Sequence, residues 1–124
     1  MYCIVFIITN LTNDKILIGT AVQEGLKLSD YGGCNTSFKR DVKDIGWENF
    51  SQEVLASFKT HEEMFELERD LVNKPFVASP KTYNVNLGGI SNHYYVRGRK
   101  NNRVKAQVPE RLKCSLSKKI KKLL

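Results

Sequence analysis

Two short runs of apolar residues near the N-terminus flank a polar link. Tyr2–Thr9 and Lys15–Thr20 are rich in Ile and Val, and the link at residues 10–14 reads Asn-Leu-Thr-Asn-Asp. Two β-branched runs on either side of such a link are typical of antiparallel strands joined as a hairpin. A third run, Phe50–Phe58, alternates loosely between apolar and polar residues and predicts a third strand.

The segment that begins near residue 35 predicts a short helix. Its apolar residues recur at helical spacing and share one face: Phe38, Val42 and Ile45. Either Asn35 or Thr36 can cap the start, and Gly46 supplies the end. Residues 21–35 hold three glycines and no sustained period, so they predict a loop over the end of the hairpin.

A second helix is predicted from Thr60 to about Lys74. Glu63 stands three residues after Thr60, which is the capping-box spacing, and Pro75 follows the predicted end. Residues 76–84 contain a further proline and predict an irregular segment returning across the domain. These elements together predict an α+β fold, a small three-stranded antiparallel sheet flanked by helices.

The C-terminal part predicts one more helix, starting at Pro109 in the favoured first-turn position. Its apolar residues form a single stripe: Leu112, Leu116, Ile120 and Leu123. Basic residues surround that stripe, so the helix could lie against DNA, a protein partner or an anionic membrane. We therefore divide the chain into a domain at residues 1–92 and a basic connector with an amphipathic helix at residues 93–124.

Charge is distributed very unevenly between these two parts. Residues 1–92 hold 9 Lys+Arg against 12 Asp+Glu, whereas residues 93–124 hold 11 against 1. A dense positive block of this kind is what binding to a phosphate backbone requires, because each neutralised phosphate releases counterions. The alternative is a solvated tail that keeps the protein soluble.

Length and cysteine content narrow the class of protein. A chain of 124 residues is long enough for one domain with a modest core. Its longest apolar run, Ile4–Ile8, is too short to span a bilayer, and no export signal is recognisable, so we expect a cytoplasmic protein with no membrane partner. Three scattered cysteines predict free thiols, because their spacing fits neither a disulfide framework nor a zinc site.

One carboxylate of the second helix is predicted to point toward the core. At about 100° per residue, the apolar residues of this helix fill one arc: Met64, Phe65, Leu67, Leu71 and Val72. Glu68 falls inside that arc, and the other charged residues, Glu66 among them, fall outside it. An inward carboxylate is costly unless it is paired, so Glu68 could bind a metal ion, pair with an arginine such as Arg40, or lie at the rim of the core.

Six segments, in order and with matching spacing, resemble the GIY-YIG nuclease family, and within it the Seg-type branch of phage homing endonucleases. They are IVFIITN (4–10), KILIG (15–19), DYGGCN (30–35), KDIGWENFSQEVL (43–55), EEMFELERDLV (62–72) and TYNVNLGG (82–89). The resemblance covers about residues 2–96 and implies the same α+β fold. It also implies a phage protein acting in the bacterial host cell.

The chemistry that this resemblance implies is metal-assisted hydrolysis of a phosphodiester bond. Glu68 matches the metal-ligand position, so the implied cofactor is Mg²⁺ or Mn²⁺. Arg40 is the candidate for the arginine that offsets charge on the phosphoryl oxygens, and Asn84 matches an asparagine that supports the site.

The sequence departs from the family at the residues expected to handle the proton. Phe6 and Leu17 stand where the resemblance expects two tyrosines, and neither side chain can accept a proton or orient water. Two functions therefore stay open. One is a GIY-YIG endonuclease that binds and cleaves double-stranded DNA, and the other is a catalytically degenerate protein of the same fold that binds DNA or a partner.

The residues predicted to bind DNA are the basic residues of the C-terminal part. They are Arg97, Arg99, Lys100, Arg103, Lys105, Arg111, Lys113, Lys118, Lys119, Lys121 and Lys122.

Overall fold

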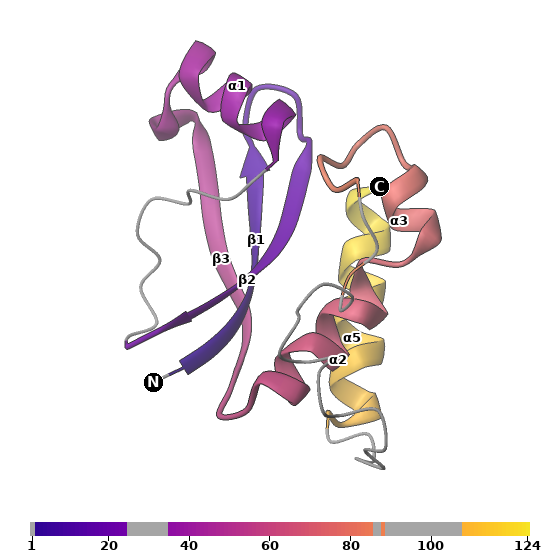
Figure 1. The fold of residues 1–124 in the computed structure, drawn as a ribbon. Coiled ribbons are helices and arrows are strands. Elements are labelled where there is room, and N and C mark those ends of the chain that lie inside the picture. Colours follow the sequence, from indigo (N-terminus) through magenta and orange to yellow (C-terminus); the bar gives the residue numbers. More distant parts are fainter. Residues whose placement is uncertain (1, 25–34, 86–87, 89–107) are drawn as a thin grey trace.

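The fold is organised around a three-stranded antiparallel sheet whose central strand comes first in the chain (Figure 1). The computed structural model describes residues 2–24, 35–85, 88 and 108–124. The elements are β1 (Tyr2–Asn10), β2 (Ile16–Gln23), α1 (Thr36–Ile45), the 3₁₀ helix η1 (Trp47–Asn49), β3 (Phe50–Phe58), α2 (His61–Leu71), α3 (Lys74–Ala78) and α5 (Glu110–Leu123). The order across the sheet is β2-β1-β3. The predicted α+β fold with three strands is confirmed.

The central strand β1 is apolar at every position from Cys3 to Ile8 because both of its faces are covered. Alternate side chains point to opposite faces of a sheet. Cys3, Val5 and Ile7 pack with α2, α3 and α5, whereas Ile4, Phe6 and Ile8 pack with α1 and η1. Figure 1 shows α2, α3 and α5 gathered on one side of the sheet. Helices α1 and α2 therefore cover opposite faces.

The predicted end of the second strand, at Thr20, is wrong. β2 continues to Gln23, and its last residues pair with the beginning of β1, Gln23 with Tyr2 and Ala21 with Ile4. The strand continues past Thr20 because the first residues of β1 offer hydrogen-bonding partners to residues 21–23. The rest of the predicted loop, residues 25–34, lies outside the described residues.

The second helix ends at Leu71, earlier than predicted, and a separate helix follows it where we expected irregular structure. Asn73 caps this short helix, α3, by accepting a hydrogen bond of 3.1 Å from the backbone N–H of Phe76. Pro75 lies in its first turn, where a missing N–H costs nothing. The proline thus starts a helix, and Phe76 is buried beneath it.

The helix caps at Asn35, Thr60 and Gly46 are confirmed. The side chains of Asn35 and Thr60 accept hydrogen bonds from backbone N–H groups three residues ahead, at 2.9 Å and 3.2 Å. Gly46 has φ 92°, a conformation that favours glycine, and its N–H donates to Val42. Trp47 packs between α1 and β3 through ring contacts with Phe38 and Phe50.

Helix α5 packs its apolar stripe onto α2 and the face of the sheet that α2 covers. Leu116 and Ile120 are 8% and 3% exposed and belong to the same core cluster as Val5 and Ile7. Figure 1 shows α5 alongside α2. The division of the chain at residue 92 stays a prediction, but the last helix shares its core with the sheet.

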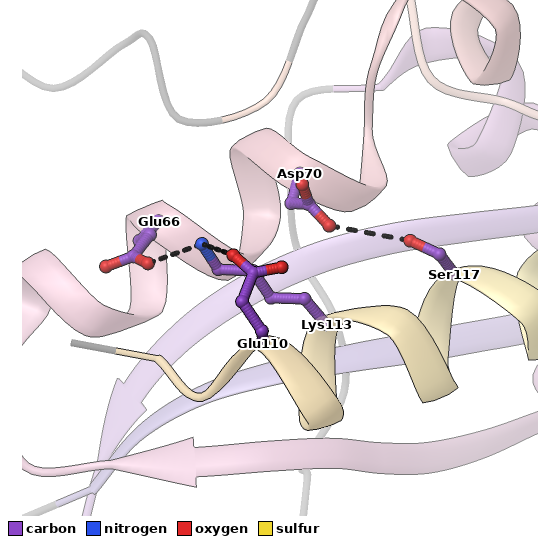
Figure 2. Close-up of polar contacts among 5 residues, drawn as sticks. All are labelled: Glu66, Asp70, Glu110, Lys113 and Ser117. Carbon is purple, nitrogen blue, oxygen red and sulfur yellow. Dashed lines mark hydrogen bonds and ion pairs between the residues drawn. The ribbon is translucent and has the colours of Figure 1, made fainter. Parts of the chain in front are cut away.

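A nearly buried ion pair joins these two helices (Figure 2). Lys113 Nζ of α5 lies 2.6 Å from Glu66 Oε2 of α2, and the two side chains are 13% and 10% exposed. The placement of Glu66 outside the buried arc was wrong, because α5 covers that flank of α2 and makes Glu66 a buried carboxylate. Its hydrogen bond raises the pKa of Lys113, although burial acts in the opposite direction. The cation therefore stays charged even as the pH rises past the ordinary lysine pKa of about 10.4.

A second ion pair has the same length and a different environment. Lys119 Nζ of α5 lies 2.6 Å from Glu53 Oε2 of β3, but these side chains are 46% and 55% exposed. Exposed pairs contribute little to stability because water screens the charges. None of the helices in the described ranges is long and apolar enough to cross a membrane.

We predict that Glu66→Gln lowers the free energy of unfolding by about 2–3 kcal/mol, because it leaves the nearly buried charge of Lys113 with only the exposed Glu110, at 3.8 Å, as a counter-charge. The matched control, Glu53→Gln, removes a pair of equal length in solvent and should cost less than about 1 kcal/mol. Urea unfolding of the two variants measures both values. Equal losses would mean that the buried pair does not hold α5.

Candidate functional site

In the segment at residues 81–88, of which 81–85 and 88 are described, residues 81–84 close the outer edge of β2 and include the predicted site residue Asn84. Ile16 donates its N–H to Lys81 O at 2.9 Å and accepts from Tyr83 N at 2.8 Å. At Ile18, two residues further along β2, the side-chain amide of Asn84 makes the hydrogen bonds that a neighbouring strand would make. Its Oδ1 accepts from Ile18 N at 3.0 Å and its Nδ2 donates to Ile18 O at 2.8 Å. Both ends of this amide are therefore engaged by the strand next to Leu17.

The same segment then reaches α2 beside Glu68. Gly88 donates its N–H to Val72 O at 2.9 Å. A Cβ at Gly88 would lie 2.4 Å from Glu68 O and 2.9 Å from Glu68 Cγ, so only glycine allows this approach. Gly88, four residues after Asn84, therefore lies directly against the backbone and side chain of Glu68.

Glu68 itself is partly exposed on α2, and Arg40 is exposed on α1. Because these helices cover opposite faces of the sheet, the two candidate residues are carried on opposite sides of it. The inward position predicted for Glu68 is only partial, since Glu66 is the more buried carboxylate of the helix.

Phe6 and Leu17 lie together in the core on the face that α1 covers. They are 1% and 2% exposed and pack in one cluster with Phe38. The ring of Phe6 lies over its cross-strand partner Gly19, where an added Cβ would come within 2.7 Å of Phe6 Cζ. These two positions present no group that can accept or donate a proton.

The side chains available as metal ligands limit the kind of metal site that Glu68 could form. Among the described residues, no group of three or more His, Cys, Asp or Glu side chains could hold a metal ion. Mg²⁺ does not require such a group, since it keeps several waters and commonly binds through one or two carboxylates and a substrate phosphate. The chain thus fits Mg²⁺ or Mn²⁺ only as an ion that Glu68 would share with a bound phosphate.

A buried polar network around Tyr83 escaped the sequence analysis. The Tyr83 hydroxyl donates to Asp41 Oδ2 at 2.6 Å and accepts from Asn10 Nδ2 at 2.9 Å. The ammonium of Lys15 lies 4.7 Å from the centre of the ring. Burial raises the pKa of Tyr83 to about 12, and Asp41 adds to the rise. A polar Asn at the end of an apolar strand was the available signal.

This network ties together three segments that are distant in the sequence. Asn10 is the last residue of β1, and its Oδ1 accepts a hydrogen bond of 2.9 Å from Thr12 N in the hairpin turn. Asp41 belongs to α1, and Tyr83 to the segment along β2. The Asn35 side chain, at the start of α1, also donates to Tyr83 O. The network therefore fixes α1 and the edge segment against the hairpin.

The predicted DNA-binding residues fall into three groups. Those outside the described residues are Arg97, Arg99, Lys100, Arg103 and Lys105. Those engaged in ion pairs within the fold are Lys113 and Lys119. Those exposed on α5 are Arg111, Lys118, Lys121 and Lys122. The described cysteines, Cys3 and Cys114, are free thiols, as predicted.

The geometry defines an α+β domain in which Asn84 is bonded to Ile18 of the hairpin and Glu68 lies against Gly88. Ninety-three residues of the chain, 74% of its length, are 40% identical to the protein named "Putative endonuclease segD" of Enterobacteria phage T4. A stretch of 88 residues is 35% identical to the protein of the same phage named endonuclease segA. Most of the chain is therefore related to phage proteins named as endonucleases.

These relationships are limited in extent. The match spans 41% of the length of segD and 39% of that of segA, so the chain corresponds to less than half of each relative. No family model matches the chain. No solved structure matches it either.

We predict that the Tyr83 phenol ionises late, well above the ordinary tyrosine pKa. Its folded pKa of about 12 lies above the unfolded value of about 10. The stability that its neutral form contributes is therefore complete below pH of about 10 and is lost as the pH rises through about 12. An ultraviolet titration should show a late phenolate step that Tyr83→Phe removes and Tyr2→Phe, at an exposed position, does not. A late step that survives in Tyr83→Phe would contradict the assignment.

We predict that Asn84→Ala lowers the free energy of unfolding by about 1–3 kcal/mol, because it leaves both backbone groups of Ile18 without their partner. The neighbouring Val85→Ala, at a side chain that is 72% exposed, serves as the control and should change little. Thermal or urea unfolding measures both. An unchanged stability in Asn84→Ala would mean that this amide has no part in closing the sheet edge.

Proposed function

We propose that this chain is a DNA-binding protein built on a GIY-YIG nuclease scaffold whose hairpin has lost the chemistry of cleavage. The observation that carries the proposal is the burial of Phe6 and Leu17, at 1% and 2% exposure, where the resemblance expects two tyrosines. An apolar contact between β1 and β2 replaces a pair of hydroxyl groups.

The relatives support a DNA-acting role. The relatives segA and segD are named as endonucleases, a class of enzyme that acts on nucleic acid. The chain is 35–40% identical to them over the matched stretches. The chain covers less than half of either relative, so the DNA-acting role is proposed for this chain and is not carried over from the whole proteins. The strongly basic residues 93–124 supply the charge that a phosphate backbone attracts.

Loss of the proton acceptor is the decisive chemical difference. A positioned general base commonly accelerates hydrolysis by about 10²–10⁴-fold, and no side chain on the buried face of the hairpin can take that role. Asn84 cannot compensate, because both ends of its amide are bonded to Ile18. Among the described residues of the hairpin, the scaffold therefore lacks a group that activates water.

Glu68 is the residue that retains a role toward the phosphate. In the scaffold it would hold Mg²⁺ or Mn²⁺ together with a DNA phosphate, and the ion would supply electrostatic stabilisation of that phosphate. Gly88 keeps the chain close to Glu68 without crowding its side chain. In the absence of a base, such an ion strengthens binding and does not by itself break the bond.

We predict that the natural protein binds duplex DNA but does not nick supercoiled plasmid in Mg²⁺ or Mn²⁺. A gel assay of nicking and a binding titration on the same preparation measure the two properties. Nicking by the natural protein that is abolished in Glu68→Gln and kept in Asp70→Asn would overturn the proposal and make the chain an active nuclease.

The hairpin is tested directly by the double variant Phe6→Tyr, Leu17→Tyr. Gain of nicking in this variant, lost again on adding Glu68→Gln, would show that the scaffold is otherwise intact. The Leu17→Tyr change enlarges a buried side chain and is expected to cost about 1–3 kcal/mol, so the unfolding curve of the variant must be recorded beside its activity.

A further inference from the structure

Packing of α5 removes its apolar stripe from solvent. Leu116 and Ile120 are buried against α2 and the sheet, and Leu112 packs at the margin of the same cluster. An amphipathic helix binds a membrane by inserting its apolar face, so a helix whose apolar face is already buried has little left to insert. The docked helix presents its polar face alone.

Two of the basic residues of α5 are also used inside the fold. Lys113 is held by Glu66, and Lys119 by Glu53, each at 2.6 Å. One turn further along the contact between α5 and α2, Ser117 Oγ of α5 donates to Asp70 Oδ2 of α2 at 3.4 Å (Figure 2). These polar contacts flank the apolar stripe and fix the rotation of the helix about its axis.

The fixed rotation leaves four cations on one outward face: Arg111, Lys118, Lys121 and Lys122. At about 100° per residue they fall within an arc of about 120°, centred roughly opposite the apolar stripe. The helix of 14 residues is about 21 Å long. Among the described residues, none of these four cations forms an ion pair, and the carboxylate of Glu110 borders the face only at its first turn.

We propose that the outward face of α5, made by Arg111, Lys118, Lys121 and Lys122, is a fixed contact surface for the phosphate backbone of double-stranded DNA. The proposal rests on the DNA binding proposed above and adds where it occurs and how. Contact is made by a helix already docked on the nuclease-like core, not by a free basic tail. Because the helix is ordered before binding, little conformational entropy is lost on contact.

Charge and geometry favour DNA over a lipid or protein partner. Lysine and arginine side chains on one helix face neutralise phosphates without reading bases, so binding by this face is independent of sequence. Helix α2 covers the inner side of α5, so α5 cannot insert into a groove of DNA as a free helix could. The face is thus suited to lie along the backbone.

An exposed thiol in the middle of this face gives a direct test. Cys114 is exposed and lies between Arg111 and Lys118 on the helix, whereas Cys3 is 3% exposed in the core. In the full chain carrying Cys34→Ser, the rate at which a maleimide labels Cys114 should fall at least several-fold when a short DNA duplex is added. The protection should be the same for duplexes of unrelated sequence and should disappear at high salt.

The matching variant is the triple substitution Arg111→Gln, Lys118→Gln, Lys122→Gln. The slope of log affinity against log salt should become shallower by about 2.7, because each lost phosphate contact removes about 0.9. The control, Lys39→Gln with Lys43→Gln, neutralises two exposed lysines of α1 on the opposite face of the sheet from α5 and should leave the slope unchanged. Both variants alter exposed side chains, and their unfolding curves should match that of the natural protein.

Each outcome decides between the proposals. Duplex binding with an unprotected Cys114 and an unchanged slope in the triple variant overturns the α5 surface and leaves DNA binding to other residues, such as Arg97, Arg99 and Lys100. No binding of the natural protein to a duplex, even at low salt, overturns the proposed function as well. Protection of Cys114 by vesicles of anionic phospholipid, but not by DNA, overturns both in favour of a membrane surface.

Discussion

The rest of the structure depends on a central strand that is hydrogen-bonded along both edges and buried on both faces. β1 pairs with β2 and β3, so its side chains have only two environments, the core under α2 and α5 or the core under α1. Every residue from Cys3 to Ile8 is buried as a result. A residue at position 6 can therefore be catalytic only if it brings a polar group into the core under α1. The phenylalanine at this position contributes only apolar packing.

The edge of β2 shows how a candidate site and a structural requirement can coincide. β2 is an edge strand, and residues 81–84 satisfy the outer backbone groups of Ile16 and Ile18, with the Asn84 side-chain amide taking the place of a strand backbone. The buried Tyr83 hydroxyl holds this segment against α1 and the hairpin turn. An asparagine placed by such bonds supports the backbone beside Leu17 whether or not the chain cleaves DNA.

Local signals in the sequence were sufficient wherever neighbours along the chain decide the structure. The hairpin, the caps at Asn35 and Thr60 and the stop at Gly46 follow from turn and capping chemistry within a few residues. Prediction failed where a distant segment decided. β2 extends to Gln23 because the start of β1 pairs with it, and Glu66 is buried because α5 packs against its helix. The Tyr83 network joins residues up to 73 positions apart, which no local pattern contains.

The sequence by itself determined the fold class, the resemblance to a nuclease family, the apolar replacements at Phe6 and Leu17 and the concentration of positive charge after residue 92, because each is a property of residue type and spacing. Only the tertiary structure decided which carboxylate is buried, which lysines form ion pairs and which face of α5 is exposed to solvent. The physical reason is that burial and pairing depend on what packs against a residue. For α5 that neighbour is α2, some forty residues earlier in the chain, and it takes the apolar stripe and leaves the basic face outward.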